Sequence, residues 1–193
     1  MALTHYLDAR LRVDDEVRSA DALAALFQRL HLYLAQTRAG DIAVSFPELT
    51  RTSGCKVKRL GNVLRMHGSA GGLGLLMQPI CWGGAVAFAD FGNVNLLPAN
   101  VLHHRIRRVQ VDSNPERLMR RAMKRKGWTE DQARQAYAGA QRKLSTLPFI
   151  SMNSRSTGQR FSLLLDVGVP IDTSTEGSFN AYGLSQEATV PYF

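Results

Sequence analysis

The sequence predicts an α+β protein: a ferredoxin-like N-terminal domain over residues 1–99, then an α+β domain over residues 100–193 with an arginine-rich helix. Three observations support this. Hydrophobic periodicity in the first half alternates in the order strand, helix, strand, strand, helix, strand. The second half opens with a strongly basic helical segment and returns to strand patterns after Pro148. A Pro-Ala-Asn break at residues 98–100 coincides with a change in charge and sets the expected boundary.

The elements of the first half follow from the spacing of apolar residues. His5–Leu11 alternates like a half-buried strand, and Ser19 is expected to cap the first helix. The helix carries one apolar stripe made of Leu23, Leu26, Phe27, Leu30 and Leu34. Strands are expected at 42–46, 57–66 and 86–97, with a glycine-rich, weakly helical stretch at 71–78. The same order of elements occurs in RNA-recognition domains.

The second half has clearer boundary signals. A strand is expected over 106–111; Arg105 precedes it, and Arg107 and Arg108 lie within it. Ser113-Asn114-Pro115-Glu116 then predicts a helix start, because a capping residue precedes a proline whose missing N–H does no harm. This helix should end at Gly127, and the capping box Thr129–Gln132 should open another helix toward Leu144. Further strands are expected at 149–152, 161–167 and 179–184.

The net charge of +8 indicates a polyanionic partner. Residues 1–100 hold ten Lys/Arg against eight Asp/Glu, whereas residues 101–143 hold twelve against four, so the excess is local. A membrane is not expected, because no apolar run approaches the roughly 18 residues of a membrane span and the N-terminus lacks signal-peptide features. Cys55 and Cys81 have no zinc-site spacing, so we expect a cytoplasmic protein with no metal and no cofactor.

The predicted helix over 115–126 carries a basic ridge. Its cations fall at i, i+3, i+4, i+7 and i+8, which is one helical face, and they are Arg117, Arg120, Arg121, Lys124 and Arg125. Leu118 and Ala122 lie on another face and should dock the helix. No aromatic residue interrupts the ridge, which favours a duplex or hairpin stem over a single strand. In the neighbouring strand, Arg108 and Gln110 are residue types that read base edges.

Three further segments carry side chains suited to chemistry, although no spacing argument joins them. His31 lies at the edge of the apolar stripe of the first helix, where an isolated histidine is usually a packing residue. Residues 154–161 form a polar turn with closely spaced hydroxyl groups, which reads equally well as a plain hairpin loop. Tyr182 lies in a predicted strand, where it could be a core aromatic.

These segments belong to an ordered series of short motifs spread over nearly the whole chain. In order they are His5-Tyr6-Leu7-Asp8, Leu30-His31, Val44-Ser45-Phe46-Pro47, Arg108-Val109-Gln110, Ser113-Asn114-Pro115-Glu116-Arg117, Leu147-Pro148-Phe149, Ser156-Thr157-Gly158-Gln159, Phe161 and Tyr182-Gly183-Leu184-Ser185. The series resembles the repeat-processing endoribonuclease of type I-F CRISPR systems, the Csy-type family. The resemblance implies a ferredoxin-like domain followed by an RNA-binding domain with an arginine-rich helix.

The resemblance also implies roles for individual residues. His31 matches the catalytic histidine, Ser154 the residue that constrains the attacking ribose, and Tyr182 the residue that orients the histidine. The resemblance implies three kinds of RNA contact. Arg108 and Gln110 would read bases near the foot of the stem, and Phe161 would stack on the closing base pair. The groove would be lined by Arg121, Lys124 and Arg125. We expect Ser156 and Thr157 to contact RNA as well. Lys124 stands where the family can have arginine, and residues 51–58 have no clear counterpart.

The activity implied is metal-independent cleavage of the CRISPR precursor RNA at the 3′ base of each repeat hairpin. Attack by a 2′-hydroxyl gives a 2′,3′-cyclic phosphate and a 5′-hydroxyl, with His31 as general base or general acid. The enzyme would then stay bound as one subunit of an RNA-guided surveillance complex. The sequence leaves open the repeat sequence, the number of turnovers, and whether that complex serves immunity or a mobile element.

Two readings without catalysis remain at this point. One is an RNA-hairpin-binding subunit of the same fold that does not cut. The other is a helix-turn-helix DNA regulator built on the two helices joined at Lys126-Gly127-Trp128-Thr129. The polycationic helix is the first of that pair, whereas DNA recognition normally uses the second.

Overall fold

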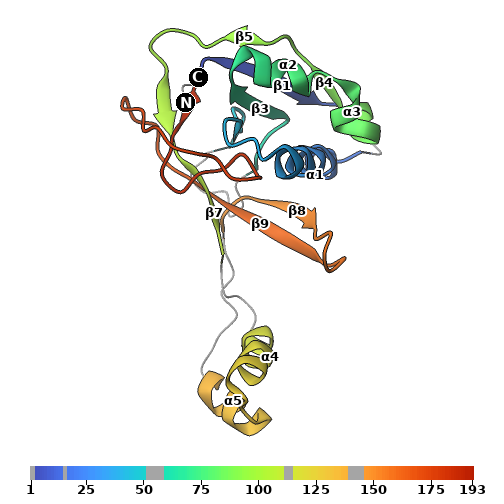
Figure 1. Cartoon of the computed structure of the whole chain (residues 1–193), viewed down its shortest axis with the longest axis vertical. Coiled ribbons are helices and arrows are strands. Elements are labelled where there is room, and N and C mark those ends of the chain that lie inside the picture. The colour runs from blue at the N-terminus through green and yellow to red at the C-terminus, as the bar shows by residue number, and fades with distance from the viewer. Residues whose placement is uncertain (1–2, 15–16, 51–58, 111–114, 139–145) are drawn as a thin grey trace. The chain divides into compact units, whose positions relative to one another are not determined.

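The computed structural model describes residues 3–14, 17–50, 59–110, 115–138 and 146–193 (Figure 1). The chain divides into two compact units, one made of residues 1–109 and 147–193 and the other of residues 110–146. The boundary expected between residues 99 and 100, from the charge shift and the Pro-Ala-Asn break, stays a prediction.

The first unit contains an antiparallel sheet of five strands. Its main path runs β2 (Ala43–Ser45), β3 (Val63–Gly68), β1 (His5–Leu11) and β4 (Ala89–Phe91), and every neighbouring pair is antiparallel. A short strand, β5 (Asn95–Leu96), pairs antiparallel with the start of β1. The helices between the strands are α1 (Ser19–Thr37), α2 (Ala70–Leu76), α3 (Pro79–Trp82) and the 3₁₀ helix η1 (Gly83–Phe88). The predicted α+β class is confirmed.

Two smaller sheets complete this unit. The strands β7 (Ile106–Val109), β9 (Arg160–Val167) and β8 (Phe149–Asn153) form an antiparallel sheet in that order. The strands β6 (Leu102–His104) and β10 (Val190–Tyr192) form an antiparallel pair that the sequence did not predict. Figure 1 shows α1 between the large sheet and β8, and α1 contacts both η1 and β8. The predicted apolar stripe of α1 is confirmed, because all five of its residues are buried.

Several predicted boundaries in this unit are wrong. Arg18, not Ser19, occupies the N-cap position of α1, and the Ser19 hydroxyl instead donates to Asn62 Oδ1 at 2.6 Å. The strand expected from residue 57 begins at Val63, because Gly61 has a φ of 84°, which a strand does not adopt. Residues 57 and 58 lie outside the described residues. The strand expected over 86–97 is split into η1, β4 and β5, with Gly92 in the break.

The second unit is a pair of helices, α4 (Pro115–Lys126) and α5 (Glu130–Tyr137). Gly127 ends α4 as predicted: its φ is 67° and its N–H donates to the Met123 carbonyl at 2.9 Å. The predicted capping box is also present, with Gln132 N donating to Thr129 Oγ1 at 3.3 Å and Thr129 N donating to Gln132 Oε1 at 2.9 Å. The helix α5 ends at Tyr137 rather than near Leu144, and the capping residues expected at 113 and 114 lie outside the described residues.

In the described part of the chain, no single helix is long and apolar enough to cross a membrane. One bent pair of segments, 70–76 with 79–88, meets the length and composition of a span only when the two are taken together.

Candidate active site

His31 lies near the middle of α1, one helical turn after Gln28, and its ring is half-buried. Its Nδ1 atom lies 2.8 Å from the carbonyl oxygen of Ala181. A carbonyl oxygen only accepts, so this hydrogen bond requires the proton on Nδ1. The neutral ring therefore presents Nε2 with a free lone pair, and Nε2 is the atom that can exchange a proton with a ligand.

The ring of Tyr182 stacks on the ring of His31, with centroids 4.1 Å apart and an interplanar angle of 6°. Tyr182 lies in a tight turn rather than in the predicted strand over 179–184, so that prediction is wrong. The turn forms because the side chain of Asn180 accepts from the backbone N–H groups of Tyr182 at 2.8 Å and Leu184 at 3.4 Å. An asparagine at 180 followed by a glycine at 183 is a turn signal from which the sequence could have predicted this turn.

Gly183 fixes this turn against the large sheet. Its carbonyl accepts from Val44 N in β2 at 3.0 Å, and its φ is 69°. A Cβ at this position would lie 2.8 Å from Cγ1 of Val44, so only glycine fits both the conformation and the space. The carbonyl of Ala181 and the ring of Tyr182 are thereby held where they meet His31.

Arg108 in β7 extends the site on the side of Tyr182. Its guanidinium carbon lies 5.4 Å from the ring centroid of Tyr182 and 5.9 Å from that of Phe161 in β9. The backbone carbonyl of Arg108 accepts from the amide of Gln186 at 3.2 Å. Four predicted site residues from distant segments thus form one row, His31–Tyr182–Arg108–Phe161, which we call the His31 row.

Ser154 lies in the turn between β8 and β9. Its backbone N–H donates to Gln159 O at 2.9 Å, its carbonyl accepts from Gly158 N at 2.8 Å, and its hydroxyl lies 3.2 Å from the hydroxyl of Ser156. The side chains of Ser156 and Thr157 are exposed, and Thr157 Oγ1 accepts from Gln159 N at 3.4 Å.

A hydrogen bond attaches this turn to the helix that carries His31. The backbone N–H of Asn153, which precedes Ser154, donates to Oε1 of Gln28 at 2.9 Å. Gln28 and His31 are three residues apart, so they lie on the same side of α1. Sequence reasoning missed Gln28, since nothing in its surroundings along the chain marks it as an anchor.

The cations of the basic helix belong to the second unit. The side chains of Arg120, Arg121, Lys124 and Arg125 are exposed, and none of them forms an ion pair with a described carboxylate. Ala122 of α4 and Ala133 of α5 are buried and the two helices contact each other, which confirms the docking predicted for Ala122. The side chain of Leu118, predicted to dock beside it, lies outside the described ones. Arg117 lies in the same helix, and Gln110 is exposed at the start of this unit.

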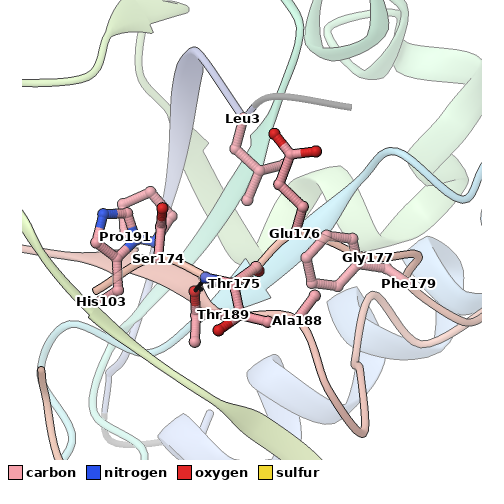
Figure 2. Close-up of a pocket in the computed structure, with 10 residues that line it drawn as sticks. All are labelled: Leu3, His103, Ser174, Thr175, Glu176, Gly177, Phe179, Ala188, Thr189 and Pro191. Atoms are coloured by element: carbon pink, nitrogen blue, oxygen red, sulfur yellow. Dashed lines mark hydrogen bonds between the residues drawn. The ribbon is translucent and has the colours of Figure 1, made fainter.

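Among the described residues, no group of three or more His, Cys, Asp or Glu side chains is arranged to hold a metal ion. A small pocket of about 130 Å³, shown in Figure 2, is lined by segments that include His103, Glu176, Phe179 and Thr189. Burial lowers the pKa of His103 there. None of the predicted site residues lines this pocket, so it is separate from the His31 row.

Comparison with known proteins agrees with the resemblance seen in the sequence. Residues 6–193 match the family model described as CRISPR-associated protein (Cas_Csy4). Two relatives, each named CRISPR-associated endonuclease Cas6/Csy4, are 38% identical to this chain: one from Pseudomonas aeruginosa (strain UCBPP-PA14) over 191 residues and one from Escherichia coli (strain UTI89 / UPEC) over 192 residues. Each alignment covers 99% of this chain and 100% of the relative.

Proposed function

The chain belongs to the Cas_Csy4 family of CRISPR-associated proteins, and we propose that it is a metal-independent endoribonuclease that cleaves a CRISPR repeat hairpin at the 3′ base of its stem. The observation that carries the proposal is the environment of His31. The Ala181 carbonyl orients the ring, Tyr182 stacks on it, and Nε2 is left for proton transfer.

The reaction needs no nucleophile from the protein. The 2′-hydroxyl beside the scissile phosphate attacks phosphorus, the O2′–P bond forms, and the P–O5′ bond breaks. His31 Nε2 takes the proton of the 2′-hydroxyl, which makes histidine the general base in the first step. The departing O5′ takes a proton from solvent water, and His31 returns its own proton to solvent after the step. The products are a 2′,3′-cyclic phosphate and a 5′-hydroxyl. Ser154 holds the attacking ribose in line, because positioning of an internal nucleophile supplies much of the rate.

The RNA is held by charge and stacking. The exposed cations of α4 lie along the groove of the stem, where phosphates relieve their mutual repulsion. In the His31 row, Phe161 stacks on the closing base pair and Arg108 reads a base edge, helped by Gln110. Ser156 and Thr157 contact the backbone from the exposed turn beside Ser154.

The wider setting of this function is also part of the proposal. We assign the N-terminal domain to the ferredoxin-like class, supported by the antiparallel order β2-β3-β1-β4 with a helix following β1 and another following β3. After cleavage the protein keeps the hairpin and acts as a subunit of a type I-F RNA-guided surveillance complex in the cytoplasm.

The decisive experiment incubates a labelled repeat hairpin in EDTA with wild type, His31→Ala, and His5→Ala as the control histidine outside the site. We expect cutting at the 3′ foot of the stem by wild type and His5→Ala alone. A hairpin with a 2′-deoxy sugar at the attacking position should bind but stay intact. Tight binding without cutting by wild type would instead identify a hairpin-holding subunit, and preference for duplex DNA would remove the RNA function.

A further inference from the structure

A hydrogen bond at the edge of a sheet links two segments of the candidate active site. Among the described strands, β8 lies at the edge of the sheet β7-β9-β8, so only one of its sides is paired within that sheet. A backbone N–H on the other side needs an acceptor from outside the sheet or from water. For Asn153, the last residue of β8, that acceptor is Oε1 of Gln28 in α1, at 2.9 Å.

Asn153 is the residue at which β8 enters the turn of Ser154. The hydrogen bonds that residues 154–159 make with described residues all stay within the turn: Ser154 pairs with Gln159, Gly158 and Ser156, and Gln159 N donates to Thr157. None of these bonds reaches α1. The polar link between the turn and the helix is therefore the one at its entrance, from Asn153 to Gln28.

Apolar packing also holds β8 against α1. The two elements contact each other, and Ile150 and Met152 of β8 are buried. Apolar contact is non-directional and tolerates a small slide or rotation of the strand, whereas a hydrogen bond weakens steeply when its angle changes. Asn153 is exposed, so the apolar contacts end before the turn begins. The bond to Gln28 fixes the orientation of β8 at that point.

Gln28 also has a fixed relation to the catalytic histidine of the proposed function. It lies three residues before His31 in α1, which places both side chains on the same side of the helix, with a rise of about 4.5 Å between them. One turn of α1 thus carries His31 and, through Asn153, holds the turn of Ser154. The C-terminal turn reaches the same part of the helix through the Ala181 carbonyl, 2.8 Å from His31 Nδ1.

We propose that Gln28 is a positioning residue for cleavage, which holds the turn of Ser154 at a fixed place relative to His31. The inference rests on the proposed function, in which Ser154 constrains the attacking ribose and His31 takes the proton of its 2′-hydroxyl. Gln28 acts through the backbone of Asn153 and is not itself a catalytic residue. Because a misplacement of about 1 Å can slow a reaction by about 10²-fold, loss of the bond should lower the rate constant of cleavage. It should leave the affinity for the stem unchanged.

The test measures cleavage and binding separately in two variants of Gln28. Gln28→Met keeps the length and helix propensity of the side chain but offers only a weak acceptor, whereas Gln28→Glu keeps an oxygen that accepts from Asn153 N–H. Single-turnover cleavage is followed in EDTA with saturating protein, on the plateau of the pH–rate profile. Gln28→Met should be slower than wild type by about tenfold, and Gln28→Glu should stay within about threefold of it. Unchanged affinity of Gln28→Met for the 2′-deoxy hairpin shows that the variant is folded.

Two further proteins separate positioning from a general effect on the helix. Gln36→Met is the matched control, because Gln36 is an exposed glutamine of the same helix whose side chain bonds to no described residue; its rate should equal that of wild type. The second is the double variant with Ser154→Ala. If Gln28 acts through Ser154, Gln28→Met should slow Ser154→Ala by only about twofold or less, since the residue that it positions is gone.

Each outcome bears on one of the two proposals. Equal rates for wild type and Gln28→Met, an equal loss in Gln28→Glu, or the full loss in the Ser154→Ala background would overturn the role of Gln28 while leaving the proposed function intact. Absence of cutting by wild type would overturn the proposed function, and the inference that rests on it would fall as well.

Discussion

The backbone carbonyl of Ala181 and the ring nitrogen Nδ1 of His31 lie 2.8 Å apart although the two residues are 150 positions apart in the chain. The contact exists because the turn of residues 180–184 is tied to β2 through Gly183 and Val44. Orientation of the histidine therefore depends on the same turn that carries Tyr182, and both depend on one glycine. Substitutions in this turn should therefore lower the cleavage rate even where the protein still folds.

The first prediction concerns the stacked ring of Tyr182. Tyr182→Phe keeps the ring and its contact with His31, so the cleavage rate should stay within about threefold of wild type. Tyr182→Ala removes the ring and frees His31 to leave its productive orientation, so the rate constant should fall about tenfold or more. Single-turnover cleavage with saturating protein measures this step apart from binding. Equal, large losses in both variants would show that the hydroxyl, not the ring, matters.

A second prediction isolates the close approach at Gly183. Gly183→Ala and Gly158→Ala both place alanine at a positive φ, 69° and 66°, but only the first would push a Cβ against Val44. Gly158→Ala should cost about 1 kcal/mol of unfolding free energy and Gly183→Ala about 2–3 kcal/mol. Urea unfolding of both proteins measures the difference. Equal costs would mean that the turn moves away from β2 without penalty.

Arg65 should be essential for stability in a way that an exposed arginine is not. Its guanidinium donates to both carboxylate oxygens of Asp8, at 2.7 and 2.8 Å, and to the Phe193 carbonyl at 3.0 Å, and it lies 4.0 Å from the Phe193 ring centroid. Lysine cannot reproduce this fork, so Arg65→Lys should lower the unfolding free energy by about 3 kcal/mol.

Arg12→Lys is the matched control for Arg65→Lys, because Arg12 forms a solvent-exposed ion pair with Asp90. We expect no measurable change in that variant. Urea midpoints at neutral pH compare the two proteins. A loss of equal size in both would contradict the argument from burial.

His67 predicts an acid-sensitive fold. Its ring is fully buried, and its Nε2 lies 2.8 Å from the Ser45 hydroxyl. Burial, followed by the nearby charge of Arg65, lowers the pKa of His67 to about 3. The unfolded chain, with a histidine pKa of roughly 6.5, binds more protons between these two values. Stability is therefore full above about pH 6.5 and falls with decreasing pH, by about 2 kcal/mol at about pH 5.

The measurement for His67 is urea unfolding across that pH range. His67→Gln should show a shallower loss of stability on acidification, whatever its stability at neutral pH. His5→Gln, which changes a partly exposed histidine at the start of β1, should keep the wild-type dependence. An unchanged pH dependence in His67→Gln would reject the assignment.

Local signals predicted local structure well. The end of α4 at Gly127, the capping box of Thr129 and the alternation of β1 all depend on neighbours a few residues away, and all three are confirmed. The turn at Asn180 was mistaken for a strand because aromatic and apolar residues in it suggested alternation. An asparagine side chain that accepts two backbone N–H groups overrode that pattern.

The site itself was not predictable from spacing. His31, Arg108, Phe161 and Tyr182 meet only after α1, two sheets and a C-terminal turn have packed together, and no periodicity encodes such contacts. Only the family resemblance joined them in the sequence. The anchoring of Asn153 by Gln28 was missed altogether, since a glutamine on a helix has no distinguishing local signal.

The last prediction concerns the exposed cations of α4. Arg121→Gln removes one charge from a ridge without described ionic partners, while the buried Ala122 that docks the helix is untouched. If each cation neutralises one phosphate of a stem, the slope of log K against log salt should become less negative by about 0.9. Arg134→Gln is the control, because Arg134 on α5 already pairs with Glu130 at 2.8 Å and should leave the slope nearly unchanged. Equal slopes for wild type and both variants would show that the RNA passes the second unit without touching α4, and the binding energy would then have to come from the first unit alone.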